Sequence, residues 1–245
     1  MPTCAETEGT VVEDEYAGVY VEAQVPVLVY LPPCYQQNSS MYPVLYLLHG
    51  KPFDEHHWPS LGVVTDTDEQ IDEDDLSGFV MVMPRIPEPL FSSTDGGPRS
   101  YEAEMTDGLM PYIEDKYRVI RSPAARAIGG ISRGGVWSLE IGLHRPDLFG
   151  TVIALSPALA VNQPREVYDP LYMASHDQDF PQRILLVAGT TDWARPDTVR
   201  LANILASQPT RSELKIVTGG HEASTWELAM PLVLQFVVDG WPAAR

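Results

Sequence analysis

The chain has 245 residues, of which 44% are hydrophobic and 20% charged, a composition typical of a folded globular protein rather than a disordered one. Its formal net charge of −18 would repel phosphate backbones, which argues against nucleic-acid binding. No stretch reaches the ~20 apolar residues that a membrane-spanning helix needs.

The predicted elements begin with strands. We expect residues 1–17 to form an irregular N-terminal segment. Alternating apolar and polar residues over 18–33 predict one or two strands, forming an antiparallel pair at a sheet edge. Six nearly continuous apolar runs then predict buried strands: residues 42–50, 78–84, 126–132, 150–157, 183–192 and 213–220.

Helix-like segments separate several of these strands, over residues 100–117, 134–146, 197–208 and 224–239. Buried strands alternating with helices predict an α/β fold, with a mostly parallel central sheet covered by helices on both faces. No internal repeat and no linker rich in proline, glycine or serine divides the chain, so we expect a single domain over 1–245.

Three irregular stretches follow strand ends, at residues 51–60, 85–100 and 157–181. Ligands bind beyond the carboxyl ends of strands in open α/β sheets, so these stretches are the expected walls of a site. Ordinary connecting loops would have the same appearance in the sequence.

The sequence offers little support for a metal site. The acidic run at 66–75 lacks the glycine and the terminal glutamate of a calcium-binding loop, which favours an acidic, solvated helix. Cys4 and Cys34 lie outside any metal-ligand spacing. Two free thiols and a disulfide are both compatible with their positions, and a disulfide would imply an oxidising compartment.

A serine flanked by glycines ends the third buried strand. Gly130-Ile131-Ser132-Arg133-Gly134 fits the pattern G-x-S-x-G, which places a nucleophilic serine on a strained turn between a strand and a helix. The glycines are needed because side chains on either side of the turn would collide. Glycine–serine runs are also common in loops, but the strand before and the helix after are the context that the motif requires. We therefore interpret Ser132 as a nucleophile.

A serine nucleophile needs a base to take its proton. In the order serine, acid, histidine, the base follows the other two members, which leaves His176 and His221 as loop candidates. His221 directly follows the last predicted strand, where a loop can bring its imidazole over the serine. No strand directly precedes His176, so we choose His221, although a solvated loop histidine would have the same sequence surroundings.

The acid should follow a late strand and orient the imidazole. Asp192 closes the strand at 183–192. Asp197 is the nearest competitor, but we expect it to be the N-cap of a helix that begins near Thr198. Asp192 is therefore the predicted acid.

Two backbone N–H groups should bind the oxyanion of the tetrahedral intermediate. One is expected from Arg133, the residue after the nucleophile, and the other from the loop after an early strand. In that loop Lys51 has an N–H and Pro52 has none. His49 is then expected to shape the loop rather than to act as a base.

With these residues identified, the chain resembles the putative-esterase branch of the α/β-hydrolase superfamily, which includes enterochelin-esterase-like, feruloyl-esterase-like and S-formylglutathione-hydrolase-like enzymes and the antigen 85 mycolyltransferases. The resemblance extends from about residue 20 to 240 and rests on an ordered set of segments: VYLPPCY, YPVLYLLHG with Trp58 downstream, FVMVMP, YEAEM, LMPYIEDKYRV, GGISRGGVWSLEIGLHRPDLF, VIALSPAL, VAGTTD and GGHEASTW. It implies the α/β-hydrolase fold, the triad Ser132, Asp192 and His221, and the oxyanion donors Lys51 and Arg133.

The chain departs from the family pattern at two positions. Cys34 stands where the family usually has glycine, which favours a disulfide with Cys4. Arg85 stands where such relatives often carry an acidic residue. The loop around Arg85 is expected to line the acyl or alcohol pocket, so substrates are less readily inferred from the relatives.

The predicted function is that of a serine carboxylesterase, acting through an acyl-enzyme on small-molecule esters with small or aromatic acyl groups and needing no metal or organic cofactor. Acyl transfer to a sugar or other alcohol would use the same triad, and a non-catalytic binding domain on this fold is a third alternative. Candidate substrate contacts are the aromatic residues Phe53, Trp58, Trp193 and Trp226, although such residues as often pack within the protein.

The compartment is predicted from composition. The first residues have neither the charged nor the apolar region of a signal peptide, which could have been trimmed. The acidic, lysine-poor composition fits export, so we expect a secreted or periplasmic protein, with the cytoplasm as the alternative. The oligomeric state is not predicted.

Overall fold

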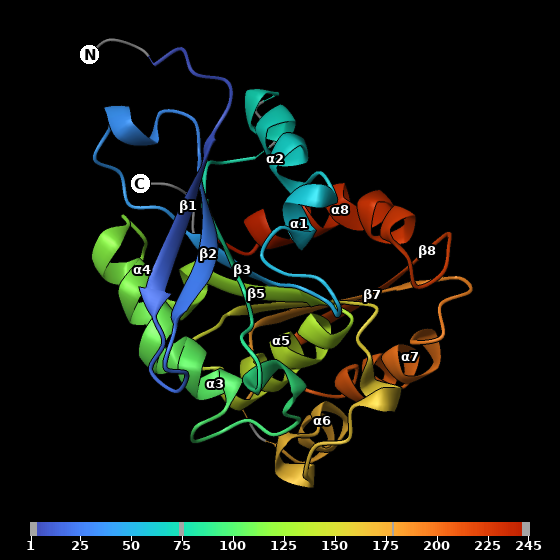
Figure 1. Ribbon diagram of the computed structural model, residues 1–245. Helices are drawn as coiled ribbons and strands as arrows, with labels where there is room; N and C mark the ends of the chain where they lie inside the picture. The colour runs from blue at the N-terminus through green and yellow to red at the C-terminus, as the bar shows by residue number, and fades with distance from the viewer. Residues whose placement is uncertain (1–3, 74–75, 178, 242–245) are drawn as a thin grey trace.

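The computed structural model describes residues 4–73, 76–177 and 179–241. An eight-stranded sheet runs through the molecule in the order β1-β2-β4-β3-β5-β6-β7-β8 (Figure 1). β2 is antiparallel to both of its neighbours, β1 and β4, and every other neighbouring pair is parallel. The strands are β1 (Thr10–Ala17), β2 (Gln24–Leu31), β3 (Val44–Leu48), β4 (Val80–Pro84), β5 (Arg126–Ile131), β6 (Thr151–Leu155), β7 (Arg183–Gly189) and β8 (Arg211–Val217).

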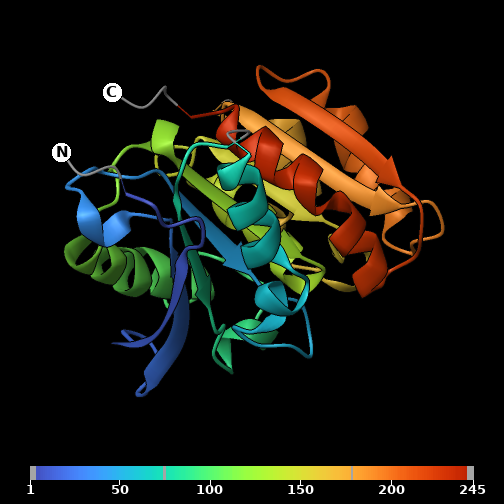
Figure 2. The same ribbon diagram turned by 90° about the horizontal axis from the view of Figure 1, so that it is seen from above.

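Helices cover both faces of this sheet. Figure 2 shows the cyan and teal helices α1 and α2 and the red helix α8 over one face; these are α1 (His57–Ser60), α2 (Val63–Asp72) and α8 (Ala223–Val238). The other face carries α3 (Tyr101–Ala103), the π-helical turn η3 (Glu104–Leu109), α4 (Met110–Lys116), α5 (Arg133–His144), α6 (Pro170–His176) and α7 (Arg195–Leu205). Short 3₁₀ turns lie at η1 (Tyr35–Gln37), η2 (Leu90–Ser92), η4 (Pro123–Ala125), η5 (Leu159–Val161) and η6 (Glu166–Tyr168). Each face has its own buried hydrophobic cluster, so the predicted architecture is confirmed.

The six apolar runs correspond to β3 through β8. Every residue of β3 to β7 is buried, whereas β8 is partly exposed because it is an edge strand. The antiparallel edge pair predicted within 18–33 is present, but residues 18–23 form its turn and the first strand lies earlier.

Three expectations about irregular segments were wrong. The segment 1–17 contains the strand β1, in which Val12, Asp14 and Tyr16 are the more buried residues and acidic residues alternate with them. Residues 51–60 and 157–181 contain the short helices α1 and α6. The acidic run forms much of α2 as expected, and its residues 74 and 75 lie outside the described part of the chain.

The N-terminal segment is tied to the turn after β2. Cys4 and Cys34 form a disulfide, with their Cα atoms 5.9 Å apart. Within the described residues, no helix has the length and apolar character required to cross a membrane.

The sheet direction determines where a site can form. Strands β3 and β5 to β8 run parallel, so their carboxyl ends lie at one edge. The segments that follow these ends contain Gly50, Ser132, Ser156, Asp192 and His221.

Candidate active site

Ser132 occupies a sharp turn between β5 and α5. Its φ of 55° and ψ of −114° are unfavourable for a residue with a side chain. A Cβ at Gly130 would lie 2.1 Å from the Gly134 carbonyl oxygen, and a Cβ at Gly134 would lie 2.4 Å from that of Leu48. Glycine is therefore required at both positions, because the helix starts in direct contact with the strands.

Hydrogen bonds join Ser132, His221 and Asp192 in one chain. The His221 Nε2 atom lies 2.9 Å from the Ser132 Oγ, and its Nδ1 lies 2.9 Å from Asp192 Oδ1. The His221 side chain is 16% exposed and that of Asp192 is fully enclosed. The structure thus brings together the three side chains selected from the sequence.

Several groups bind the Asp192 carboxylate. Burial acts to raise its pKa, but hydrogen bonds from His221, the neighbouring Ser156 hydroxyl and the Ala194 N–H outweigh burial, so the pKa lies below its ordinary value. The Ala194 N–H donates to Oδ1 at 2.8 Å, which also closes the turn before α7. Asp192 therefore stays ionised at neutral pH.

Ser156 was not among the site residues predicted from the sequence. Ser156 directly follows β6, as Ser132 follows β5, and it too has a positive φ, 47°. The Trp226 indole N–H donates to its Oγ at 3.0 Å. A serine directly after a strand beside β5 was the signal that could have indicated it.

His176 and Asp197, the competing candidates for the base and the acid, lie outside this series of hydrogen bonds. His176 lies on α6, where its ring stacks on Tyr172 and its Nδ1 lies 2.9 Å from the Tyr172 carbonyl oxygen. The prediction that Asp197 is an N-cap was wrong: α7 begins two residues earlier, at Arg195, and Asp197 lies in its first turn.

The loop after β3 lies against Ser132. A Cβ at Gly50 would be 3.4 Å from Ser132 Cβ. The backbone N–H groups of Lys51, in this loop, and Arg133, at the start of α5, donate to no other group among the described residues. Both are thus free to bind an oxygen atom near Ser132.

His49 shapes this loop as expected. Its Nε2 accepts a hydrogen bond from the Ile86 N–H at 2.9 Å, so the proton of the neutral ring lies on Nδ1, which is 3.1 Å from the Gly50 carbonyl oxygen. Burial lowers the pKa of His49, which favours this neutral form.

The candidate aromatic residues differ in their access to solvent. Trp193 is 47% exposed and Phe53 is 48% exposed, and the Trp193 indole packs on His221 with ring centroids 4.4 Å apart. Trp226 is buried and meets the His221 ring edge-on. The expectation that Trp58 contacts substrate was wrong: it is 1% exposed, and its indole N–H donates to the Leu48 carbonyl in the core.

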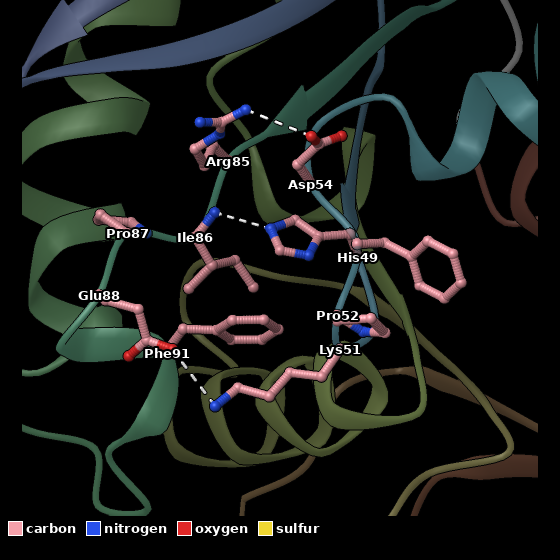
Figure 3. Close-up of a pocket in the computed structure, with 10 residues that line it drawn as sticks. His49, Lys51, Pro52, Asp54, Arg85, Ile86, Pro87, Glu88 and Phe91 are labelled. Atoms are coloured by element: carbon pink, nitrogen blue, oxygen red, sulfur yellow. Dashed lines mark hydrogen bonds and ion pairs between the residues drawn. The ribbon is translucent and has the colours of Figure 1, made fainter.

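The loop between β3 and α1, residues 49–56, is called the Gly50 loop. A cavity of about 600 Å³ lies beside it (Figure 3). His49, Phe53 and Phe91 line it, and charged side chains surround them. Its remaining lining residues are Lys51, Pro52, Asp54, Arg85, Ile86, Pro87 and Glu88.

Ion pairs hold the charged side chains of this cavity. Lys51 pairs with Glu88 at 3.3 Å, as the dashed line in Figure 3 marks. Arg85 binds the buried Glu55 at 2.6 Å and Asp54 at 3.3 Å. Arg85 therefore fixes the position of the loop that follows β3.

Among the residues that the structure describes, two groups of side chains have potential metal-binding atoms close together, but other bonds engage them. Cys4 and Cys34 lie near Glu6 and are joined in the disulfide. Asp54 and Glu55 lie near His56, and Arg85 binds both carboxylates.

Comparison with known proteins identifies the family of this chain. The model of the family described as putative esterase matches residues 19–237. The chain is 30% identical over 169 residues to the endo-1,4-beta-xylanase/feruloyl esterase of Xylanibacter ruminicola, a match over 64% of this chain and 23% of that protein. It is 29% identical over 154 residues to the ferri-bacillibactin esterase BesA of Bacillus subtilis, over 58% of this chain and 52% of that protein. The chain thus spans about a quarter and about half of these curated relatives.

Solved structures show the same fold. A ferulic acid esterase superposes with a TM-score of 0.85 at 24% identity, over 96% of this chain and 99% of that one. An S-formylglutathione hydrolase from Staphylococcus aureus superposes with a TM-score of 0.79 at 17% identity, over 94% and 99% of the two chains. The protein is therefore a member of the putative esterase family, with the α/β-hydrolase fold predicted from its sequence.

Proposed function

We propose that this protein hydrolyses carboxylic esters through an acyl-enzyme on Ser132, with His221 as the base and Asp192 as the acid that orients it. The observation that carries the proposal is the position of His221, whose two ring nitrogens each lie 2.9 Å from an atom of the other two residues. A base within hydrogen-bond reach of the nucleophile, itself oriented by a third group, is the arrangement that activates a serine hydroxyl.

The reaction has two half-steps. In the first, Ser132 Oγ attacks the ester carbonyl carbon while its proton passes to His221 Nε2. The C–O bond to the alcohol then breaks, and the imidazolium returns the proton to the departing oxygen. In the second, His221 takes a proton from water, the hydroxide attacks the acyl-enzyme, and the proton returns to Ser132 as the acid leaves.

A positive charge develops on the His221 imidazole and a negative charge on the carbonyl oxygen in each half-step, and the site has a group to stabilise each charge. The ionised Asp192 stabilises the imidazolium, since its pKa lies below the ordinary value. The free N–H groups of Lys51 and Arg133 are the proposed donors to the oxyanion, and such preorganised donors are commonly worth about 3–4 kcal/mol each in the transition state.

We further propose that small or aromatic acyl groups are the substrates. The half-exposed rings of Trp193 and Phe53 are available to a flat acyl group. Two relatives are named feruloyl or ferulic acid esterases, and the cavity beside the Gly50 loop offers room for part of an ester.

The test is hydrolysis of p-nitrophenyl esters with acyl chains from acetyl to dodecanoyl, and of a feruloyl ester, by the wild type and by Ser132→Ala. We expect the variant to lose at least about 10⁴-fold in kcat, and the wild type to prefer the short and feruloyl esters. Ser175→Ala changes an exposed serine on α6 and is the matched control.

Two results would contradict parts of this proposal. Unchanged hydrolysis by Ser132→Ala would rule out this serine as the nucleophile. Ester products in place of the free acid, after addition of a sugar or simple alcohol, would favour acyl transfer over hydrolysis.

We also propose that the protein works in an oxidising compartment outside the cytoplasm. The disulfide between Cys4 and Cys34 supports this, because such bonds persist mainly in oxidising surroundings. Protein taken from its native cells should react with a maleimide only after reduction. Labelling of both thiols before reduction would contradict the proposal.

A further inference from the structure

Gly50 directly precedes Lys51, whose backbone N–H is a proposed donor to the oxyanion. A Cβ at this position would lie 3.2 Å from the Ile131 carbonyl oxygen and 3.4 Å from Ser132 Cβ, so the loop approaches the nucleophile closely. Glycine has more backbone freedom than any other residue. The direction of the following N–H, that of Lys51, therefore needs a restraint from outside the glycine.

One restraint acts on the Gly50 carbonyl. Its oxygen accepts a hydrogen bond from the Phe53 N–H at 3.0 Å and lies 3.1 Å from the protonated Nδ1 of His49. In a planar trans peptide, the C=O and the following N–H point in opposite directions. Fixing the Gly50 oxygen therefore directs the Lys51 N–H away from His49 and Phe53.

His57 supplies the second restraint, on the other side of Gly50. The Gly50 N–H donates to His57 Nδ1 at 3.2 Å. The His57 ring is 3% exposed, and the Phe53 ring stacks on it with centroids 3.9 Å apart and an interplanar angle of 4°. Trp226 meets it edge-on at 5.8 Å. The acceptor atom is thus held in place by packing.

The hydrogen bond requires one tautomer of His57. A backbone N–H can only donate, so Nδ1 carries no proton and the neutral ring is protonated on Nε2. Burial, together with the nearby His49, lowers the pKa of His57 to about 4, although Asp54 acts in the opposite direction. The ring is therefore neutral and able to accept at neutral pH.

We propose that His57 is a positioning residue for the oxyanion site: its Nδ1 holds the Gly50 N–H and so directs the Lys51 N–H toward the substrate oxygen. This inference rests on the proposed function, because it gives His57 a part in the reaction of Ser132. The oxyanion forms only in the transition state, so the effect of His57 falls on kcat more than on KM.

Two substitutions separate the hydrogen bond from the packing. His57→Phe keeps a ring against Phe53 but removes the acceptor, whereas His57→Asn places an amide oxygen near the position of Nδ1. We expect His57→Phe to lower kcat about 10- to 100-fold, as for a misplaced catalytic group, with KM little changed. His57→Asn should recover most of that loss. His56→Phe, at the exposed neighbouring histidine, is the matched control.

The kinetics can overturn the proposal in two ways. Wild-type kcat in a folded His57→Phe variant would show that the hydrogen bond has no part in catalysis. A smaller loss in His57→Phe than in His57→Asn would show that the ring acts only through packing.

A second measurement does not depend on activity or on a substitution. The ¹⁵N chemical shifts of His57 in the wild type should report a neutral ring protonated on Nε2 at pH 7. A ring protonated on Nδ1, or an imidazolium, would overturn the inference even in an active enzyme. If the wild type hydrolysed no ester, that result would instead contradict the proposed function. The failure of the His57 inference and the failure of the proposed function are therefore distinguishable.

Discussion

The two oxygens of Asp192 have different surroundings. Oδ1 accepts hydrogen bonds from both His221 and the Ala194 N–H. Oδ2 is buried, and the Ser156 hydroxyl, whose oxygen accepts a hydrogen bond from Trp226, is the neighbouring group with a proton left to donate to this carboxylate. The bond to Ala194 fixes the carboxylate, so that Oδ1 is presented to the imidazole and holds its proton on Nδ1.

We expect Asp192→Asn to lower kcat by about 10³- to 10⁴-fold. The amide is neutral and cannot stabilise the imidazolium, and its NH₂ group can donate to Nδ1, which would favour the wrong tautomer of His221. Steady-state hydrolysis of p-nitrophenyl acetate measures the loss, and Asp197→Asn, in the first turn of α7, is the control. Equal losses in the two variants would remove Asp192 from the proposed triad.

The indole of Trp193 is half-exposed and packs on His221, so it lies where it can contact an acyl group bound next to Ser132. Trp193→Ala should raise KM for the feruloyl ester about 3- to 10-fold, corresponding to the loss of one aromatic contact. The KM for the acetyl ester should change much less, because that ester has no ring to stack. A similar change for both esters would mean that the indole supports His221 and does not contact the acyl group.

The sequence was sufficient to select the three side chains of the proposed triad, but not the residues that support them. Ser132, Asp192 and His221 each follow a strand end in a fixed order, so local pattern and chain order identify them. His57 and Trp58 are neighbours in the four-residue helix α1. So short a helix has no useful periodicity, and the partners that bury both side chains come from β3, the Gly50 loop and α8.

At the scale of elements, apolar runs predicted the buried strands well and the edge strands less well. β1 was missed because the acidic Asp14 occupies one of its more buried positions. Three acidic residues, Glu13 to Glu15, therefore interrupt the alternation between Val12 and Tyr16. α6 was missed because prolines and polar residues surround it. Its N-terminus was visible in the sequence, where Asp169 precedes Pro170 and accepts a hydrogen bond from the Leu171 N–H.

Helix α5 contains an acidic residue that has no part in the proposed mechanism. Glu140 is fully buried, and neither of its carboxyl oxygens accepts a well-formed hydrogen bond among the described residues, although the Gly96 N–H lies close enough to lower the pKa of this carboxyl slightly. Burial raises the pKa of Glu140 to about 9, despite the opposing charge of Arg133. The side chain is therefore neutral in the folded protein at neutral pH and charged in the unfolded chain.

This difference makes the stability of the protein depend on pH. Because the folded pKa lies above the unfolded one, the contribution of Glu140 is fully present below about pH 4.5 and is lost as the pH rises toward 9. Glu140→Gln removes this titration, so its Tm relative to wild type should rise by several °C between pH 5 and pH 8. Calorimetry at the two pH values measures it.

Comparing two pH values isolates the charge. Any cost of burying the new amide is the same at both, so it cancels in the difference. Glu22→Gln, at an exposed position in the turn between β1 and β2, is the control and should show no such trend. A Tm difference for Glu140→Gln that is the same at pH 5 and pH 8 would mean that the carboxyl is ionised in the folded protein.

For the molecule as a whole, charge is the dominant departure from an ordinary domain. The chain has 34 acidic residues and 16 basic ones, so at least 18 carboxylates have no basic partner of their own. Many of the ion pairs are solvent-exposed, where each contributes little. Repulsion between carboxylates should therefore outweigh attraction, and it opposes the compact state.

Helix α2 shows this repulsion locally. Burial and the nearby carboxylates of Glu69 and Glu227 raise the pKa of Asp66, which is half-buried where α2 meets α8. Salt shortens the range of such interactions from ~30 Å at 0.01 M to ~8 Å at 0.15 M. We therefore expect Tm at pH 7 to rise between 0.01 M and 0.5 M NaCl.

Asp66→Asn should raise Tm at low salt, and this gain should shrink at high salt because screening already weakens the repulsion. Equal gains at both salt concentrations would attribute the effect to burial alone, and a fall in wild-type Tm with added salt would mean that the ion pairs outweigh the repulsion.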